Sequence, residues 1–78
     1  MKINDFVSFY FDHERFRRKV KAILIENDLT AEDIAPSIGY AERTVINYLH
    51  GGSDSRFIAG ALCDRFNLNP KNFMKEGY

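Results

Sequence analysis

Apolar side chains recur at helical intervals from Asp12 onward. One stripe, as on an amphipathic helix, is formed by Phe16, Val20, Ile23, Leu24 and Asn27. Asp12 has a side chain suited to capping the N-terminus of that helix. Asn27 tolerates the turn conformations in which helices end. The pattern therefore predicts a first long helix from about residue 12 to residue 27.

A short second helix is predicted at about residues 31–38. Thr30, in the stretch TAED, can accept a hydrogen bond from the amide of Asp33 in the spacing of a capping box. Gly39 supplies the positive φ with which a chain leaves a helix. Pro36 removes one helical hydrogen bond and crowds the preceding turn, so we expect a distortion there. The apolar face of this helix is formed by Ile34, Ala35 and Ile38.

A third helix is predicted within GYAERTVINYLHGG, residues 39–52. Val45, Tyr48 and Leu49 form its inward stripe. The glycine pair at positions 51 and 52 is expected to end it, because glycine readily adopts the conformations found beyond helix C-termini. The predicted arrangement is thus a helix, a three-residue turn and a second helix.

Two further apolar segments follow. Residues 59–66 repeat apolar side chains at i, i+3, i+4 and i+7, which predicts a fourth helix. Its inward positions are Ala59, Leu62, Cys63 and Phe66. Next, Asn69 is a candidate cap and Pro70 stands at the favoured first helical position. Phe73 and Met74 are then expected to return to the core.

The length and composition restrict the class of protein. A chain of 78 residues with 45% apolar residues is expected to form one globular domain. No apolar run approaches the roughly 18 residues of a membrane span. The N-terminus lacks the uninterrupted apolar stretch of a secretory signal, and the single cysteine has no disulfide partner. We therefore expect a cytoplasmic protein without a membrane association.

The net charge of zero conceals an uneven distribution. Five cations crowd the predicted first helix: Arg15, Arg17, Arg18, Lys19 and Lys21. Residues 22–42 hold five acids and no base. A charge run of this kind is most often a solvated helix face. A net charge of zero gives no general attraction to nucleic acid.

The sequence contains no constellation typical of catalysis or metal binding. Cys63 lies on an apolar stripe, where a buried cysteine behaves as a small hydrophobic residue. His13 and His50 are isolated from each other and from cysteine at any metal-binding spacing. The glycine pair follows a helix, which is not the strand-to-helix context of a phosphate-binding loop. We expect no enzyme activity, cofactor, metal or small-molecule ligand.

The stretch LTAEDIAPSIGYAERTVINYLHGG, residues 29–52, resembles the helix-turn-helix of the phage repressor and Cro family, the xenobiotic-response-element class. Ala35 matches the family's small residue, Gly39 its turn glycine and Val45 its buried aliphatic. The resemblance implies an all-α, compact, four- to five-helix lambda-repressor-like domain over residues 12–78, with the motif at 30–50. An aromatic segment, residues 1–11, precedes this domain.

In this family the second helix of the motif, here residues 42–50, lies in the major groove of double-stranded DNA. The resemblance implies base contacts from Glu42, Arg43, Ile46 and Asn47. Arg43 is suited to guanine, Asn47 to adenine and Glu42 to cytosine. It implies contacts to the DNA backbone from Arg18, Lys19, Thr30, Ala31 and Thr44. The implied function is a sequence-specific transcriptional regulator of phage or mobile-element type.

Three departures from the family pattern keep an alternative open. Ala41 stands where the family often has a capping Ser or Thr. Leu24 and Leu49 stand where many members have an ion pair. The predicted second helix is acidic at the end that normally approaches a phosphate. The alternative is a protein-interaction module that keeps the repressor-like fold without binding DNA.

The aromatic segment FVSFYF, residues 6–11, fits both a helical and an alternating spacing. It is expected either to fold back over the helices of its own chain or to form an exposed interface. Because one recognition helix contacts few base pairs and the chain is too short for a separate dimerisation domain, we expect a homodimer. Phe9 and Phe11 are its predicted contacts. A second candidate surface comprises Phe57, Phe73 and Tyr78.

Overall fold

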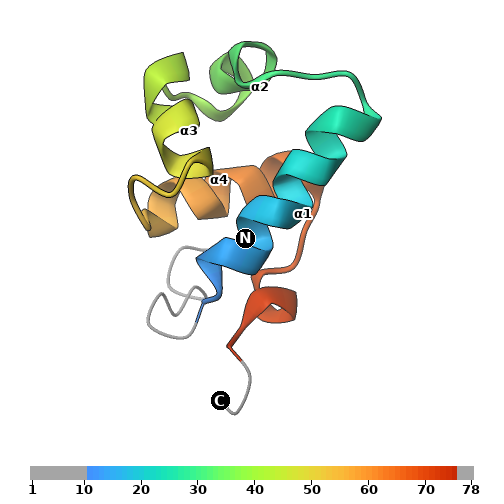
Figure 1. Ribbon diagram of the computed structural model, residues 1–78, viewed down its shortest axis with the longest axis vertical. Helices are drawn as coiled ribbons and strands as arrows, with labels where there is room; N and C mark the ends of the chain where they lie inside the picture. Colours follow the sequence, from blue (N-terminus) through green and yellow to red (C-terminus); the bar gives the residue numbers. More distant parts are fainter. Residues whose placement is uncertain (1–10, 76–78) are drawn as a thin grey trace.

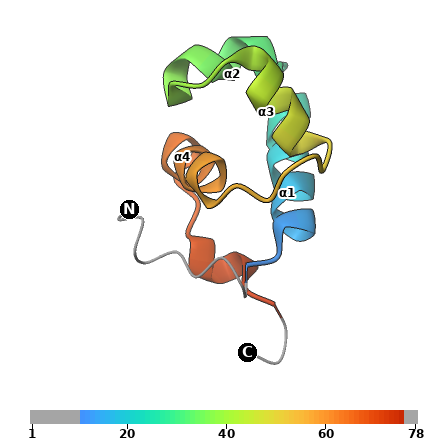
Figure 2. The same cartoon turned by 90° about the vertical axis from the view of Figure 1, so that its left-hand side faces the viewer.

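The computed structural model describes residues 11–75, and these residues are predominantly helical. The elements are α1 (His13–Glu26), α2 (Ala31–Ile38), α3 (Glu42–Leu49), α4 (Arg56–Phe66) and the short 3-10 helix η3 (Pro70–Phe73). Figures 1 and 2 show α2 and α3 together at one end of the molecule and η3 at the other, with α1 and α4 between them. The predicted all-α class is confirmed for the described residues, in which the extended backbone pairs only at an isolated bridge.

The helix ends follow the predicted capping chemistry. Asp12 accepts a hydrogen bond from the amide of Arg15 at 3.1 Å. Thr30 and Asp33 form a reciprocal capping box at the start of α2. Gly39 ends α2 in the left-handed region, with φ of 79°. These contacts satisfy backbone groups that helix termini leave without intrahelical partners.

Pro36 does not interrupt α2, so the predicted distortion does not break the helix. The amide of Gly39 still donates to the carbonyl of Ala35 at 3.0 Å, beyond the proline. Pro36 is exposed to solvent. The cost of its missing hydrogen bond therefore falls on one position in a helix capped at both ends.

One continuous core joins the helices. Its members are Phe11, Phe16, Val20, Leu24, Ile34, Ala35, Val45, Tyr48, Leu49, Ile58, Ala59, Leu62, Cys63 and Phe73. The predicted inward stripe of α3 is confirmed, as is most of that of α4, where Phe66 is only partly buried. In the stripe of α1, Phe16, Val20 and Leu24 are buried, whereas Ile23 is partly buried and Asn27 is exposed. Burial raises the pKa of the Cys63 thiol to about 12, which keeps it protonated in the core.

Phe11 belongs to this core, as the alternative in which the aromatic segment folds back over its own helices predicts, and this burial disfavours its predicted role as a dimer contact. Its side chain is only 1% exposed. Its ring lies 5.1 Å from that of Phe16, edge to face, and its backbone pairs with Met74. The amide of Asp12 donates to the carbonyl of Phe73 at 2.6 Å. These contacts hold the start of α1 against η3. Phe11 is buried there because a large aromatic side chain stabilises a small core more than it would stabilise the protein when exposed to solvent.

The other candidate contacts are distributed differently. Phe9 and Tyr78 lie outside the described residues. Phe73 is buried, whereas Phe57 on α4 is 53% exposed. No helix in the part of the chain from 11 to 75 is both long and apolar enough to cross a membrane.

Candidate nucleic-acid interface

The exposed side of α3 carries all the predicted base-contact residues. The helix buries Val45, Tyr48 and Leu49 against the core. Because an α-helix repeats every 3.6 residues, the positions between them face outward. The exposed side chains are Glu42, Arg43, Thr44, Ile46 and Asn47. The structure thus brings together one acid, one base, one amide, one hydroxyl and one apolar group on a single helix face.

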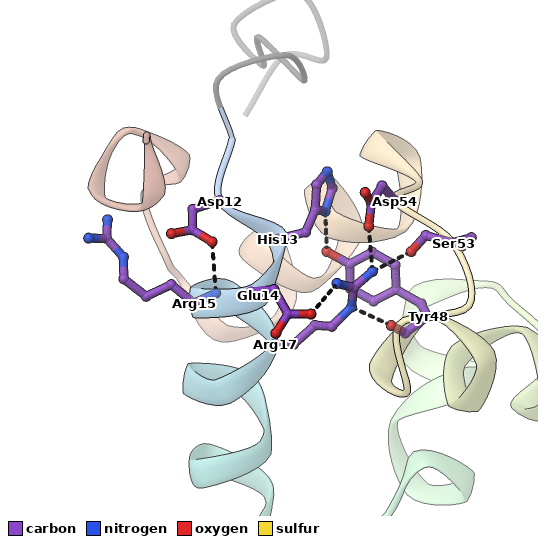
Figure 3. A network of polar contacts seen from close by, with 8 residues as sticks. All are labelled: Asp12, His13, Glu14, Arg15, Arg17, Tyr48, Ser53 and Asp54. Atoms are coloured by element: carbon purple, nitrogen blue, oxygen red, sulfur yellow. Dashed lines mark hydrogen bonds and ion pairs between the residues drawn. The ribbon is translucent and has the colours of Figure 1, made fainter. Parts of the chain in front are cut away.

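Arg17 of α1 holds the C-terminal end of α3. Its side chain is only 6% exposed, and its Nε donates to the carbonyl of Tyr48 at 2.6 Å. The guanidinium also donates to the carbonyl of Ser53 and, at 2.6 Å, to a carboxylate oxygen of Asp54. Figure 3 shows the guanidinium lying between Glu14 on one side and the segment after α3 on the other. One buried cation therefore links α1, α3 and the loop that leads to α4.

Tyr48 is the partner around which this network is built. Its side chain is fully buried, and the Arg17 guanidinium carbon lies 4.7 Å from the centre of its ring. The Tyr48 hydroxyl and Nδ1 of His13 are 2.7 Å apart. A buried tyrosine normally needs a partner for its hydroxyl, and His13 provides it. The network thus fixes both ends of the Tyr48 residue, backbone and hydroxyl.

The protonation states of the network follow from burial and charge. Burial lowers the pKa of His13, with the nearby Arg17 charge acting in the same direction. Burial likewise raises the pKa of the Tyr48 hydroxyl far above its usual value. The hydrogen bond from Arg17 lowers the pKa of Asp54. The folded state therefore favours a neutral His13, a neutral Tyr48 and an ionised Asp54.

Asn47 lies against the loop after α3. A side-chain carbon placed on Gly52 would fall 2.0 Å from Oδ1 of Asn47. The amide of Gly52 donates to the carbonyl of Asn47 at 2.8 Å. The Asn47 amide group therefore rests beside a glycine that leaves room for it. A contact from Asn47 to adenine requires this side chain to turn away from Gly52.

The start of α2 is occupied by its own carboxylate. The Asp33 side chain accepts from the amide of Thr30 at 2.8 Å and from its hydroxyl at 3.0 Å. An incoming phosphate would meet this negative charge at the helix end where phosphates otherwise bind. Thr30 is exposed and Ala31 is partly buried. Of the predicted backbone contacts, these two are the least favoured by the geometry.

The cations of α1 occupy different flanks of the helix. Lys21 lies along a groove with Ile46 of α3 and with His50, the residue that follows α3. Lys19 stands two residues before Lys21, and because a helix turns about 100° per residue it lies on nearly the opposite flank. Both Arg18 and Lys19 are exposed. Arg18 precedes Lys21 by three residues and so shares its flank. Of these exposed cations, Lys21 is the one that lines the groove shared with α3, and Arg18 lies nearer to it on the helix surface than Lys19 does.

Sequence reasoning missed the structural role of Arg17, His13 and Lys21. The charge pattern predicts that Arg17 is solvated like its neighbouring cations, yet Arg17 is buried. A signal was present, because His13 and Arg17 precede the core residues Val20 and Leu24 by seven, so both fall on the apolar stripe of α1. A charged residue on such a stripe indicates a buried partner. Lys21 gave no comparable signal.

A polar hollow of about 450 Å³ adjoins the network. It is lined by Phe11, Asp12, His13, Glu14, Arg17, Gly51, Asp54 and Lys75. Among the residues that the structure describes, no group of three or more His, Cys, Asp or Glu side chains could hold a metal ion. Two of the charged groups that line this hollow, Glu14 and Asp54, are ion-pair partners of Arg17.

Replacing Arg17 by methionine is expected to lower the free energy of unfolding by about 2–3 kcal/mol, because buried hydrogen bonds to a charged group are lost. Arg18→Met removes the same charge at the exposed neighbouring position and is expected to change stability by less than about 0.5 kcal/mol. Urea unfolding followed by circular dichroism measures both. Equal effects of the two substitutions would contradict the anchoring role of Arg17.

His13 is expected to make the stability depend on pH. Its folded pKa lies below the ordinary value of 6.5, so the unfolded chain takes up the proton first as the pH falls. The stabilisation is complete above about pH 6.5 and decreases as the pH falls toward the folded pKa. Unfolding free energies between pH 7.5 and 5 should therefore fall more for the native chain than for His13→Gln.

The exposed His50 offers the matched control, since the sequence has two histidines. His50→Gln is expected to keep the pH dependence of the native chain. If His50→Gln removed that dependence and His13→Gln preserved it, the assignment to His13 would be wrong.

Comparisons of the chain with protein-family models, with curated proteins and with solved structures gave no match. The case for a function therefore depends on the residues and geometry described above.

Proposed function

We propose that this protein is a sequence-specific double-stranded DNA-binding transcriptional regulator with a lambda-repressor-like helix-turn-helix formed by α2 and α3. Residues 39–41 join the two helices. Ala35 is buried, and Gly39 adopts a positive φ at the turn. These features support the resemblance to the repressor and Cro family. In the proposed complex α3 enters the major groove, as in that family.

The exposed face of α3 carries the proposal. It combines Arg43, which is suited to guanine, with Glu42 and Asn47, which are suited to cytosine and adenine. The opposite face is held by three core side chains and by Arg17. A recognition helix must be held rigidly while its polar face stays accessible, and α3 meets both requirements.

The phosphate contacts of the proposed complex differ from those first expected. Lys21 lines the groove that Ile46 of α3 also lines, and the exposed Arg18 precedes it by three residues on α1. The exposed Thr44 offers a hydroxyl on α3 itself. Asp33 makes the start of α2 a poor phosphate site. With a net charge of zero, affinity depends on these local cations rather than on the charge of the whole domain.

Occupation of a pseudo-palindromic operator by two copies is part of the proposal, because one α3 contacts only a few base pairs. The burial of Phe11 disfavours it as a contact between the two copies. Phe9 lies outside the described residues. Sedimentation in the presence and absence of operator DNA measures this stoichiometry.

The second candidate function is a protein-interaction module with the same fold. One observation favours it: Ile25, at the end of α1, is 81% exposed beside an apolar groove. Exposed apolar patches often mark contacts with other proteins. Under this alternative, α3 would bind no duplex even at low ionic strength.

Fluorescence anisotropy with a random-sequence duplex across a salt series separates the two candidates. For a DNA-binding protein, the logarithm of the binding constant falls linearly with the logarithm of the salt concentration. The absence of binding at low salt would exclude the DNA-binding proposal. If the protein binds duplex DNA, selection from a random duplex pool identifies the preferred operator.

Arg43→Ala is expected to weaken binding to the selected operator by about 1–3 kcal/mol and binding to random duplex much less, because a bidentate guanine contact is lost. Lys71→Ala is the control for the loss of one charge. Lys71 is exposed on η3, at the end of the molecule away from α3 (Figure 1). Equal losses on operator and random DNA would make Arg43 a phosphate contact instead.

Lys21→Ala is expected to reduce the slope of the salt dependence by about one while leaving the selected sequence unchanged, because a phosphate contact carries no base information. Lys19→Ala removes the same charge from the other flank of α1 and is expected to leave the slope unaltered. Anisotropy titrations at several salt concentrations measure both variants. If Lys19→Ala reduced the slope more than Lys21→Ala, the flank of α1 that carries Lys19 would face the DNA instead.

A further inference from the structure

An apolar groove lies beside the base-reading face of α3. It has a volume of about 320 Å³ and lies between the end of α1, the start of α2 and α3. Its lining residues are Lys21, Leu24, Ile25, Leu29, Ala31, Ile46, Leu49 and His50. Two of these are large apolar side chains that remain open to solvent: Ile25 is 81% exposed and Ile46 is 36% exposed. The groove is therefore a partly open apolar surface continuous with α3.

The position of Ile46 ties this groove to DNA. Ile46 follows Glu42 by four residues and Arg43 by three, so the three side chains are neighbours on the helix surface. A duplex that places Arg43 against a base edge brings adjoining base pairs toward Ile46. The apolar feature that such base pairs present in the major groove is the C5-methyl group of thymine.

The charge of the groove suits the same occupant. None of its lining residues is acidic, although the chain as a whole has as many acids as bases. Lys21 stands at its edge and offers a cation to the DNA backbone. The combination of an apolar floor and a cationic edge matches a methyl group beside a phosphate.

We propose that Ile46, in this groove with Ile25, reads the C5-methyl group of a thymine in the operator. This inference rests on the proposed DNA-binding function and adds the base pair that the apolar part of α3 selects. Ile46 acts here as a specificity-determining residue, and Lys21 supplies the accompanying backbone contact.

Replacing thymine by uracil tests the proposal, because uracil lacks only the methyl group. In duplexes selected by the protein from a random pool, each thymine is replaced by uracil in turn and binding is measured by anisotropy. At one position of each half-site, the replacement is expected to lower the affinity of the native chain about fourfold, the effect of burying one methyl group.

The Ile46→Ala variant assigns that effect to the groove. It is expected to bind the thymine operator about fourfold less tightly and to show no further loss on the uracil operator. Phe57→Ala removes an exposed apolar side chain of α4 outside the groove and is expected to keep the full uracil effect. Because the uracil replacement alters only the DNA, it gives a result that does not depend on the folding of any variant.

Three outcomes would overturn the inference. Uracil that is tolerated at every position would show that no methyl group is read. A uracil effect that persists in Ile46→Ala would assign the methyl contact to another residue. Tight binding of an acidic protein segment at the groove, with operator affinity unchanged by Ile46→Ala, would assign the groove to a protein partner. If the chain bound no duplex at all, the DNA-binding proposal itself would have failed.

Discussion

The buried guanidinium of Arg17 is the contact on which the placement of α3 depends. Arginine stays charged at any accessible pH, so its burial requires acceptors that satisfy its fixed fork of donors. The carbonyls of Tyr48 and Ser53 and the carboxylate of Asp54 meet that requirement. The first of these carbonyls lies at the C-terminal end of α3. Because α3 has no basic residue in its own last turn, Arg17 supplies from α1 the positive charge that favours a helix C-terminus.

This arrangement connects the core to the surface proposed to read DNA. Tyr48 is buried between His13 and Arg17, while its helical neighbours Ile46 and Asn47 point outward. A helix fixed through one face cannot rotate without breaking the contacts on that face. The side chains available to a ligand are therefore selected by the packing of the opposite side. The face that Arg17 of α1 holds and the candidate interface are two sides of the same eight-residue helix, α3.

The Asp33 carboxylate at the start of α2 has two effects. The capping carboxylate of Asp33 stabilises α2 through its first turn and, by the same charge, disfavours a phosphate there. In the proposed complex, the contacts with the DNA backbone are therefore assigned to α1, on the flank that carries Lys21. One side chain thus improves the stability of a helix and changes the geometry with which the domain would approach DNA.

The amino-acid pattern was sufficient to place the helices, because apolar periodicity and capping are local properties. Thr30 and Asp33 lie within one helical turn of each other, Gly39 directly follows α2, and Val45, Tyr48 and Leu49 lie within two turns of one helix. The outward side of α3 followed from its inward side by the helical repeat alone. Residues near in sequence were enough for these predictions.

The pattern was not sufficient where partners are distant in sequence. Arg17 and Asp54 are 37 residues apart, and His13 and Tyr48 are 35 apart. Local spacing places Arg17, one of five neighbouring cations, on the apolar stripe of α1. The groups that accept hydrogen bonds from its guanidinium come together only when α1 packs against the end of α3. Phe11 likewise becomes a core residue because η3 returns to its side. Long-range packing decided which charges are buried and which flank of α1 faces α3, since burial depends on the elements that meet there rather than on the residues adjacent in the chain.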